Sequence, residues 1–226
     1  MGSVLESEGN LYVCNAGGSP NVAVFPPGGT TPSLSLQGLT QPTTAAIDTN
    51  GDVYVANRGS QPSILVFTQG QATAYRTITD PLIQIPTQVQ FDGSRNLYFS
   101  DNVTNVSEIP HGSQNAESLG LQGLTNTSGI ALDTKSGNIY VSDIGHNPNQ
   151  VALYKAGSTQ PAERLNQSSA DELTFAPLGH TGYLFVPDTV SNQVLNYKAG
   201  SRNPHLIIGT DLQYLIAAAI KPPGVP

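Results

Sequence analysis

A seven-residue segment that recurs along the chain limits the possible folds more than any other feature. The copy at Gly51–Asn57 reads GDVYVAN, and similar segments surround four other aromatic residues. The five aromatic positions are Tyr12, Tyr54, Tyr98, Tyr140 and Phe185, at spacings of 42, 44, 42 and 45 residues. A near-constant period of this length indicates one supersecondary unit repeated five times.

Each repeat contains four short segments that are typical of strands. An alternating segment such as Ile64–Phe67 follows the aromatic one, and a more polar segment such as Ser33–Leu36 comes next. A last segment such as Ala45–Asp48 leads through a tight Asp-Gly turn into the next repeat. No stretch of ten or more residues has the 3.6-residue period of an amphipathic helix.

These patterns predict an all-β fold, a β-propeller of five four-stranded blades that forms one domain over residues 1–226. Blades that are packed on both faces explain why the aromatic strands are apolar without clean alternation. The blade repeats are expected at roughly 9–50, 51–93, 94–135, 136–180 and 181–224.

The two ends of the chain are expected to close the ring. The first repeat starts at its aromatic strand, without a full inner strand before it, and the chain ends with an apolar segment. We therefore expect Ala217–Ile220 to pair beside Leu11–Cys14 and to complete the first blade, because an unclosed ring exposes two long strand edges. Val4–Leu5 is a shorter competitor for the same place, since Leu5 also fits the position that Ile47 holds in the second repeat.

The pattern at Pro42–Asn57, continued at Ile64–Phe67, resembles the NHL-type repeat. This resemblance extends over nearly the whole chain and implies a propeller. It also implies, through a larger superfamily that includes gluconolactonase-like calcium-dependent hydrolases, that a metal-dependent lactonase is one function to consider. The chain departs from the family in two respects, since NHL propellers more often have six blades, and Phe175–Gly182 replaces the usual turn with a longer one. One propeller fold supports many chemistries, so the resemblance specifies the fold more than the function.

The composition narrows the range of partners. The net charge is −7 and charged residues make up 11% of the chain, so no nucleic acid is expected as a partner. The longest notable apolar run, Leu215–Ile220, is too short to span a bilayer, and the first eight residues do not have the pattern of a signal peptide.

The single cysteine, Cys14, excludes an intrachain disulfide. The polar, low-charge composition favours a secreted or periplasmic location, and we expect a monomer without membrane contact.

A set of equivalent polar residues follows the aromatic strands. Its members are Asn15, Asn57, Asp101, Asp143 and Asp188. Their oxygens would suit a hard cation such as calcium if they converged on the axis. Recurrence in every blade instead favours a structural part, in which each side chain caps its own turn. We therefore expect no cofactor, with calcium as the ion to consider if one is bound.

The inner strands are expected to line a central channel. The side chains predicted to face the axis are those of Thr44, Ala46, Gln88, Gln90, Gly129, Ala131, Glu172, Thr174, Ala217 and Ala219. Gln88, Gln90, Glu172 and Thr174 form the polar side of this set and are the candidate ligand-binding residues, with a water-filled channel as the alternative.

Two residues in loops after the aromatic strands are further candidates, as the rim of the channel mouth. These are Arg58, which could bind a carboxylate, and His146, which could act as a ligand or base. The alternative is that both are solvated surface residues.

No catalytic residue is identified. Asp171 and Glu172 are adjacent in one strand, so their side chains point to opposite faces and cannot act as an acid–base pair across a glycosidic bond. The motifs of serine hydrolases, zinc proteases and phosphate-binding loops are missing from the sequence.

The sequence therefore favours a non-enzymatic binding or scaffold protein, whose channel-mouth loops contact a protein or a small polar ligand. The alternative is the metal-dependent hydrolase that the resemblance implies, with Glu172, Asn15, Asn57 and Asp143 as substitutes for its metal ligands. A second alternative is a fragment, or an engineered repeat protein, without an activity of its own.

Overall fold

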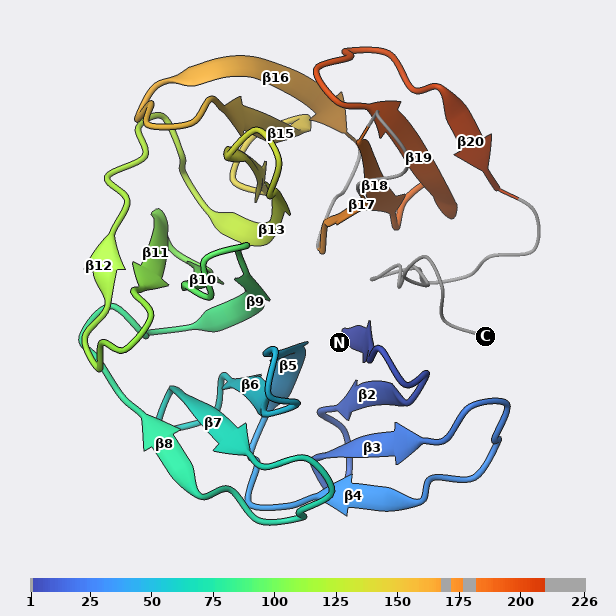
Figure 1. Cartoon of the computed structure of the whole chain (residues 1–226). Helices are drawn as coiled ribbons and strands as arrows, with labels where there is room; N and C mark the ends of the chain where they lie inside the picture. The colour runs from blue at the N-terminus through green and yellow to red at the C-terminus, as the bar shows by residue number, and fades with distance from the viewer. Residues whose placement is uncertain (1, 168–171, 177–181, 210–226) are drawn as a thin grey trace.

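The computed structural model describes residues 2–167, 172–176 and 182–209, which form five four-stranded antiparallel sheets around a central axis (Figure 1). The predicted five-bladed β-propeller is confirmed. Within each sheet the strands follow the order of the chain, and the first strand of the sheet lies nearest the axis (Figure 1). No helix in the described ranges is long and apolar enough to cross a membrane.

Each blade is one contiguous stretch of the chain. From the axis outward the strands are, in blade 1, β1 (Ser3–Leu5), β2 (Leu11–Asn15), β3 (Asn21–Phe25) and β4 (Leu34–Leu36); in blade 2, β5 (Pro42–Ile47), β6 (Val53–Asn57), β7 (Ser63–Phe67) and β8 (Arg76–Ile78); in blade 3, β9 (Pro86–Phe91), β10 (Leu97–Asp101), β11 (Asn105–Ile109) and β12 (Glu117–Ser118); in blade 4, β13 (Thr127–Asp133), β14 (Asn138–Asp143), β15 (Asn149–Tyr154) and β16 (Pro161–Gln167); and in blade 5, β17 (Thr174–Ala176), β18 (Tyr183–Asp188), β19 (Gln193–Lys198) and β20 (Leu206–Ile208).

Apolar packing between the facing surfaces of neighbouring blades forms the core. Strand β7 shows the arrangement, because its side chains alternate between two buried clusters. Leu65 and Phe67 pack with residues of blade 1, and Ile64 and Val66 pack with residues of blade 3. Further clusters join blade 3 to blade 4 and blade 4 to blade 5. Burial on both faces is why β7 reads as a continuous apolar run.

The first blade is completed by the N-terminal strand, which corrects the expected closure. In β1, Ser3, Val4 and Leu5 pair with Val13, Tyr12 and Leu11 of β2. Since β3 occupies the other edge of β2, both edges of this strand are paired without the segment 217–220, which lies outside the described residues. The physical reason is proximity along the chain, because joining β1 to β2 closes a loop of only a few residues, whereas the C-terminal segment would have to close almost the whole chain.

The repeats visible in the sequence are offset by one strand from the sheets. The expected repeat boundaries fall in the turns between the first and second strands of each blade, such as the turn between β5 and β6. Ala45–Asp48 ends the first sequence repeat, but in the structure this segment corresponds to β5, the inner strand of the second blade.

Removing β1 is predicted to destabilise the protein. A variant that lacks residues 2–5 leaves one edge of β2 unpaired and exposes the apolar surface that Val4 and Leu5 cover. We expect the free energy of unfolding to fall by about 2–4 kcal/mol, the order expected for partial loss of two large buried side chains. Urea denaturation compares the free energy of unfolding of this variant with that of a C-terminal truncation that lacks residues 215–226. A larger loss in the C-terminal truncation would contradict the closure by β1.

Candidate functional site

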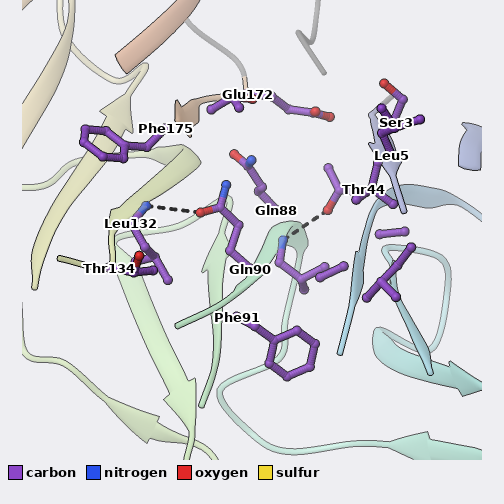
Figure 2. A pocket seen from close by; sticks show the side chains of 16 residues that line it. Ser3, Leu5, Thr44, Gln88, Gln90, Phe91, Leu132, Thr134, Glu172 and Phe175 are labelled. Atoms are coloured by element: carbon purple, nitrogen blue, oxygen red, sulfur yellow. Dashed lines mark hydrogen bonds between the residues drawn. The ribbon is translucent and has the colours of Figure 1, made fainter. Parts of the chain in front are cut away.

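A cavity of about 310 Å³ lies on the axis of the propeller. It is lined by inner-strand residues of all five blades, among them Thr44, Gln90, Leu132, Thr174 and the N-terminal strand β1 (Figure 2). The lining reaches the last residues of β5 and β9 but not their first residues. The cavity therefore lies toward the end of the propeller at which the inner strands finish, called here the cavity end. The opposite end, where the inner strands begin, is called the clamp end.

Gln88 connects three blades across the channel. Its side-chain oxygen accepts hydrogen bonds from the backbone N–H of Ile130 in blade 4, at 2.8 Å, and of Leu173 beside blade 5, at 3.1 Å. Its amide nitrogen donates to the carbonyl oxygen of Leu173 at 2.8 Å. This buried side chain thus supplies hydrogen-bond partners to the backbone of β13 and of Leu173, the residue that precedes β17, and these bonds link the three blades.

Gln90 repeats this contact one step closer to the cavity end. Its side-chain oxygen accepts a hydrogen bond of 3.1 Å from the backbone N–H of Leu132 (Figure 2), and its amide nitrogen lies 3.4 Å from the carbonyl oxygen of Leu173. Part of the hydrogen-bonding capacity of the predicted polar wall, Gln88 and Gln90, is therefore used to join blades. Of the two, Gln90 is the more exposed to the cavity, since Gln88 is buried.

Glu172 brings a carboxylate to the cavity wall, beside Thr174 of the same blade. Its carboxylate occupies the space that a Cβ atom on residue 2 would need, so the absence of a side chain at Gly2 makes room for it. The nearby Cys14 thiol is buried, and burial raises its pKa, with a further contribution from the Glu172 carboxylate. The sequence identified Glu172 as an axial residue, whereas the part of Gly2 was missed because a lone glycine near the chain start has no distinctive signal.

The two rim candidates lie at the other end of the propeller from this cavity. Arg58 directly follows β6, and His146 follows β14, so both belong to the clamp end. The Nε2 atom of His146 lies 3.0 Å from a carboxylate oxygen of Asp143. The structure thus brings together Gln88, Gln90, Glu172 and Thr174, and separates Arg58 and His146 from them.

Three of the polar residues after the aromatic strands fix the loop that leads into the inner strand of the same blade. The side-chain oxygen of Asn57 accepts hydrogen bonds from the backbone N–H groups of Thr40 and Gln41, both at 2.9 Å. Asp101 and Asp143 bind the corresponding loops of blades 3 and 4 in the same way. We call these three residues the clamp residues. Asn15 and Asp188 instead cap their own turns, as expected, by accepting bonds from backbone N–H groups two or three residues ahead.

The two clamp carboxylates differ in their proton affinity. Burial is the largest influence on Asp101 and raises its pKa, because the two backbone hydrogen bonds and the nearby Arg58 compensate only in part. Burial would also raise the pKa of Asp143, but hydrogen bonds from Asn126, Thr125 and Gly145 outweigh it, and the pKa is lowered.

The residues named for a hydrolase metal site do not surround one point. Asn57 and Asp143 direct their oxygens to backbone N–H groups at the clamp end, Asn15 bonds to its own turn, and Glu172 lies at the axial cavity. In the described part of the chain, no group of three or more His, Cys, Asp or Glu residues is placed to hold a metal ion.

Comparisons with known proteins identify the fold. No family model matches the chain, and no curated protein matches it in sequence. A chain in the crystal structure of a nidogen/laminin complex is similar, with a TM-score of 0.79 and 16% identity, over 97% of this chain and 83% of that one. Hydrazine synthase of Kuenenia stuttgartiensis has a TM-score of 0.67 and 14% identity, over 88% of this chain and 63% of that one. At these identities the likeness shows a β-propeller, which is compatible with a binding or scaffold role, and the NHL type stays a prediction.

Replacement of the two clamp carboxylates, Asp101 and Asp143, by asparagine is predicted to change the stability of the protein in different ways. Asp101→Asn keeps an oxygen that can accept both N–H groups, as Asn57 does, and removes a buried charge, so we expect stability at neutral pH to be kept or raised. Asp143→Asn removes a carboxylate whose charged form is favoured, and we expect a loss of about 1–3 kcal/mol in the free energy of unfolding.

The pH dependence follows from the same shifts. Folding lowers the pKa of Asp143, so the ionised carboxylate stabilises the folded protein. This stabilisation is fully present above the pKa of the unfolded chain, about 3.9, and is lost as the pH falls through the pKa of the folded protein. Asp101 has the opposite effect, because folding raises its pKa and the ionised carboxylate therefore destabilises the folded protein. This destabilisation is present above the pKa of the folded protein and disappears as the pH falls to the pKa of the unfolded chain. Chemical denaturation of both variants between acid and neutral pH tests this, and equal losses in the two would contradict it.

Proposed function

We propose that this protein is a non-enzymatic binding propeller that holds a polar ligand, or a polar side chain of a protein partner, in the axial cavity. The cavity itself carries the proposal. It combines a carboxylate, an amide and hydroxyl groups with the apolar surface of Leu132 and Phe175, the usual mixture of a small-molecule site.

The rigidity of the cavity wall supports this proposal. Gln88 joins the inner strands of three blades, and Thr44 joins β5 to β9 by donating to the carbonyl oxygen of Thr87 at 3.2 Å and accepting from the N–H of Val89 at 3.1 Å. A wall that is fixed before binding loses little freedom when a ligand enters. The similar propeller in the nidogen/laminin complex comes from a protein–protein assembly, which is consistent with a protein partner for this chain.

The metal-dependent hydrolase remains the alternative, with calcium as its ion. Its strongest support in the structure is Glu172, a carboxylate at the axial cavity. The separation of Asn57 and Asp143 from that cavity weighs against it, because a single ion requires its ligands within about 2.3–2.6 Å of one point.

Filling the cavity is predicted to abolish binding. Polar metabolites and short peptides are screened for stabilisation against heat, and hits are measured by calorimetry. Ser3→Leu adds bulk at a partly exposed position of the cavity lining and is expected to weaken binding at least about tenfold, the effect of roughly 1.4 kcal/mol. The matched control is the double variant Arg58→Ala and His146→Ala at the clamp end, which should bind as the parent does.

Two results would contradict the proposal. Binding that survives Ser3→Leu but is lost in the clamp-end double variant would move the contact surface to the clamp end. Turnover of simple lactones in the presence of calcium or zinc, abolished by Glu172→Gln, would establish the hydrolase instead.

A further inference from the structure

A second pocket, of about 140 Å³, is lined by residues of blades 2 and 3, and of these residues Phe91 also lines the axial cavity. Its basic lining comes from three different places in the chain: Arg76 at the start of β8, Arg95 in the turn between β9 and β10, and His111 in the turn between β11 and β12. Tyr54 and Phe91 form an aromatic wall, with ring centroids 4.9 Å apart and planes at 85°. These turns place the pocket at the cavity end, on the surface between the two blades.

The charge of this pocket stands out against the chain as a whole. The protein has nine Lys and Arg residues and a net charge of −7, yet two arginines and a histidine line this one small pocket. Among the described residues that line it there is no Asp or Glu. Two guanidinium groups without a lining carboxylate favour an anion.

Within the described residues, Arg76 and Arg95 lack the kind of partners that Arg164 and Arg202 have. Arg164 donates to the side-chain oxygen of Gln150 at 3.0 Å and to the carbonyl oxygen of Gly123 at 2.7 Å, and Arg202 lies 3.8 Å from a carboxylate oxygen of Glu163. Across the described ranges, no carboxylate lies within ion-pair distance of Arg76, Arg95 or His111. Their donors are therefore available to an external oxygen acceptor.

Arg95 occupies a backbone position that the repeat otherwise reserves for glycine. Its φ is +67°, and the equivalent residues Gly9, Gly51 and Gly137 have φ of +90°, +85° and +71°. A residue with a Cβ atom is uncommon in this left-handed region and is disfavoured there relative to glycine. A side chain kept at such a position, where glycine would fit the turn better, points to a use for that side chain.

We propose that this pocket is a carboxylate-binding site, which takes a carboxylate on a short aliphatic stem. The two guanidinium groups supply paired donors that match the two oxygens of a carboxylate. Ile78, Leu97 and Ile109 supply the apolar surface for the stem, and the volume leaves room for little more than such a group. A free small carboxylic acid and an acidic side chain of a protein partner both carry this chemistry. The site does not depend on what the axial cavity binds.

The test uses the full chain and calorimetric titration at low and at physiological salt. The probes are glutarate, a capped tripeptide with a central glutamate, inorganic phosphate, and glutaramide as the uncharged counterpart of glutarate. Arg95→Gly restores the glycine of the repeat, so it is expected to fold at least as stably as the parent while removing one guanidinium. Arg76→Gln removes the other, and Arg202→Gln is the control for an arginine outside the pocket.

We expect saturable binding of glutarate or the peptide that falls at least about tenfold in Arg95→Gly and in Arg76→Gln and is unchanged in Arg202→Gln. Tighter binding of the peptide would assign the site to a protein partner, and tighter binding of glutarate would assign it to a free acid. No saturable binding of either, equal binding of glutaramide, unchanged affinity in both pocket variants, or much tighter binding of phosphate would each overturn the carboxylate site.

Discussion

Burial of the apolar surfaces between neighbouring blades is the constraint on which the structure depends. A four-stranded sheet with two apolar faces cannot stand alone in water, so each blade needs a neighbour on both sides. The alternation in β7, with Leu65 and Phe67 directed to one neighbour and Ile64 and Val66 to the other, meets this need with a single strand. A ring covers the facing surfaces of successive blades in this way, and it also determines that the inner strands converge on an axis.

Near the axis the described inner strands of different blades form no common ladder, although the Gly2 N–H donates to the carbonyl oxygen of Thr43, and polar side chains add further links between blades. Gln88, Gln90 and Thr44 bond to the backbone of neighbouring inner strands, while the clamp residues hold the loops that enter those strands. These bonds satisfy buried polar groups that would otherwise be costly. Polar residues with this structural role line the axial wall and the clamp end. From the sequence alone they cannot be distinguished from polar residues that bind a ligand.

The sequence was sufficient to predict the blades, because the aromatic residues and turn glycines recur with the period of the structural unit. It was not sufficient to predict which terminus completes blade 1. Val4–Leu5 and 217–220 both fit the apolar pattern, and a pattern carries no measure of the chain length that must be closed. Gln88 was correctly placed at the axis, but its bonds to Leu173, 85 residues away, depend on the ring geometry. The sequence has arginine at position 95 where the other repeats have glycine, whereas the proximity of Arg95 to Arg76 and His111 depends on how one strand and two turns are placed in space.

Completion of blade 1 by β1 means that every sheet is encoded by an uninterrupted segment. In such a ring, duplication or deletion of one repeat at the gene level would add or remove a whole sheet without cutting any ladder of backbone hydrogen bonds. Among the described residues the first and last blades share no strand, so a change in the number of units divides no sheet. A propeller built in this way is suited to evolutionary change in blade number, and with it to change in the width of its axial opening.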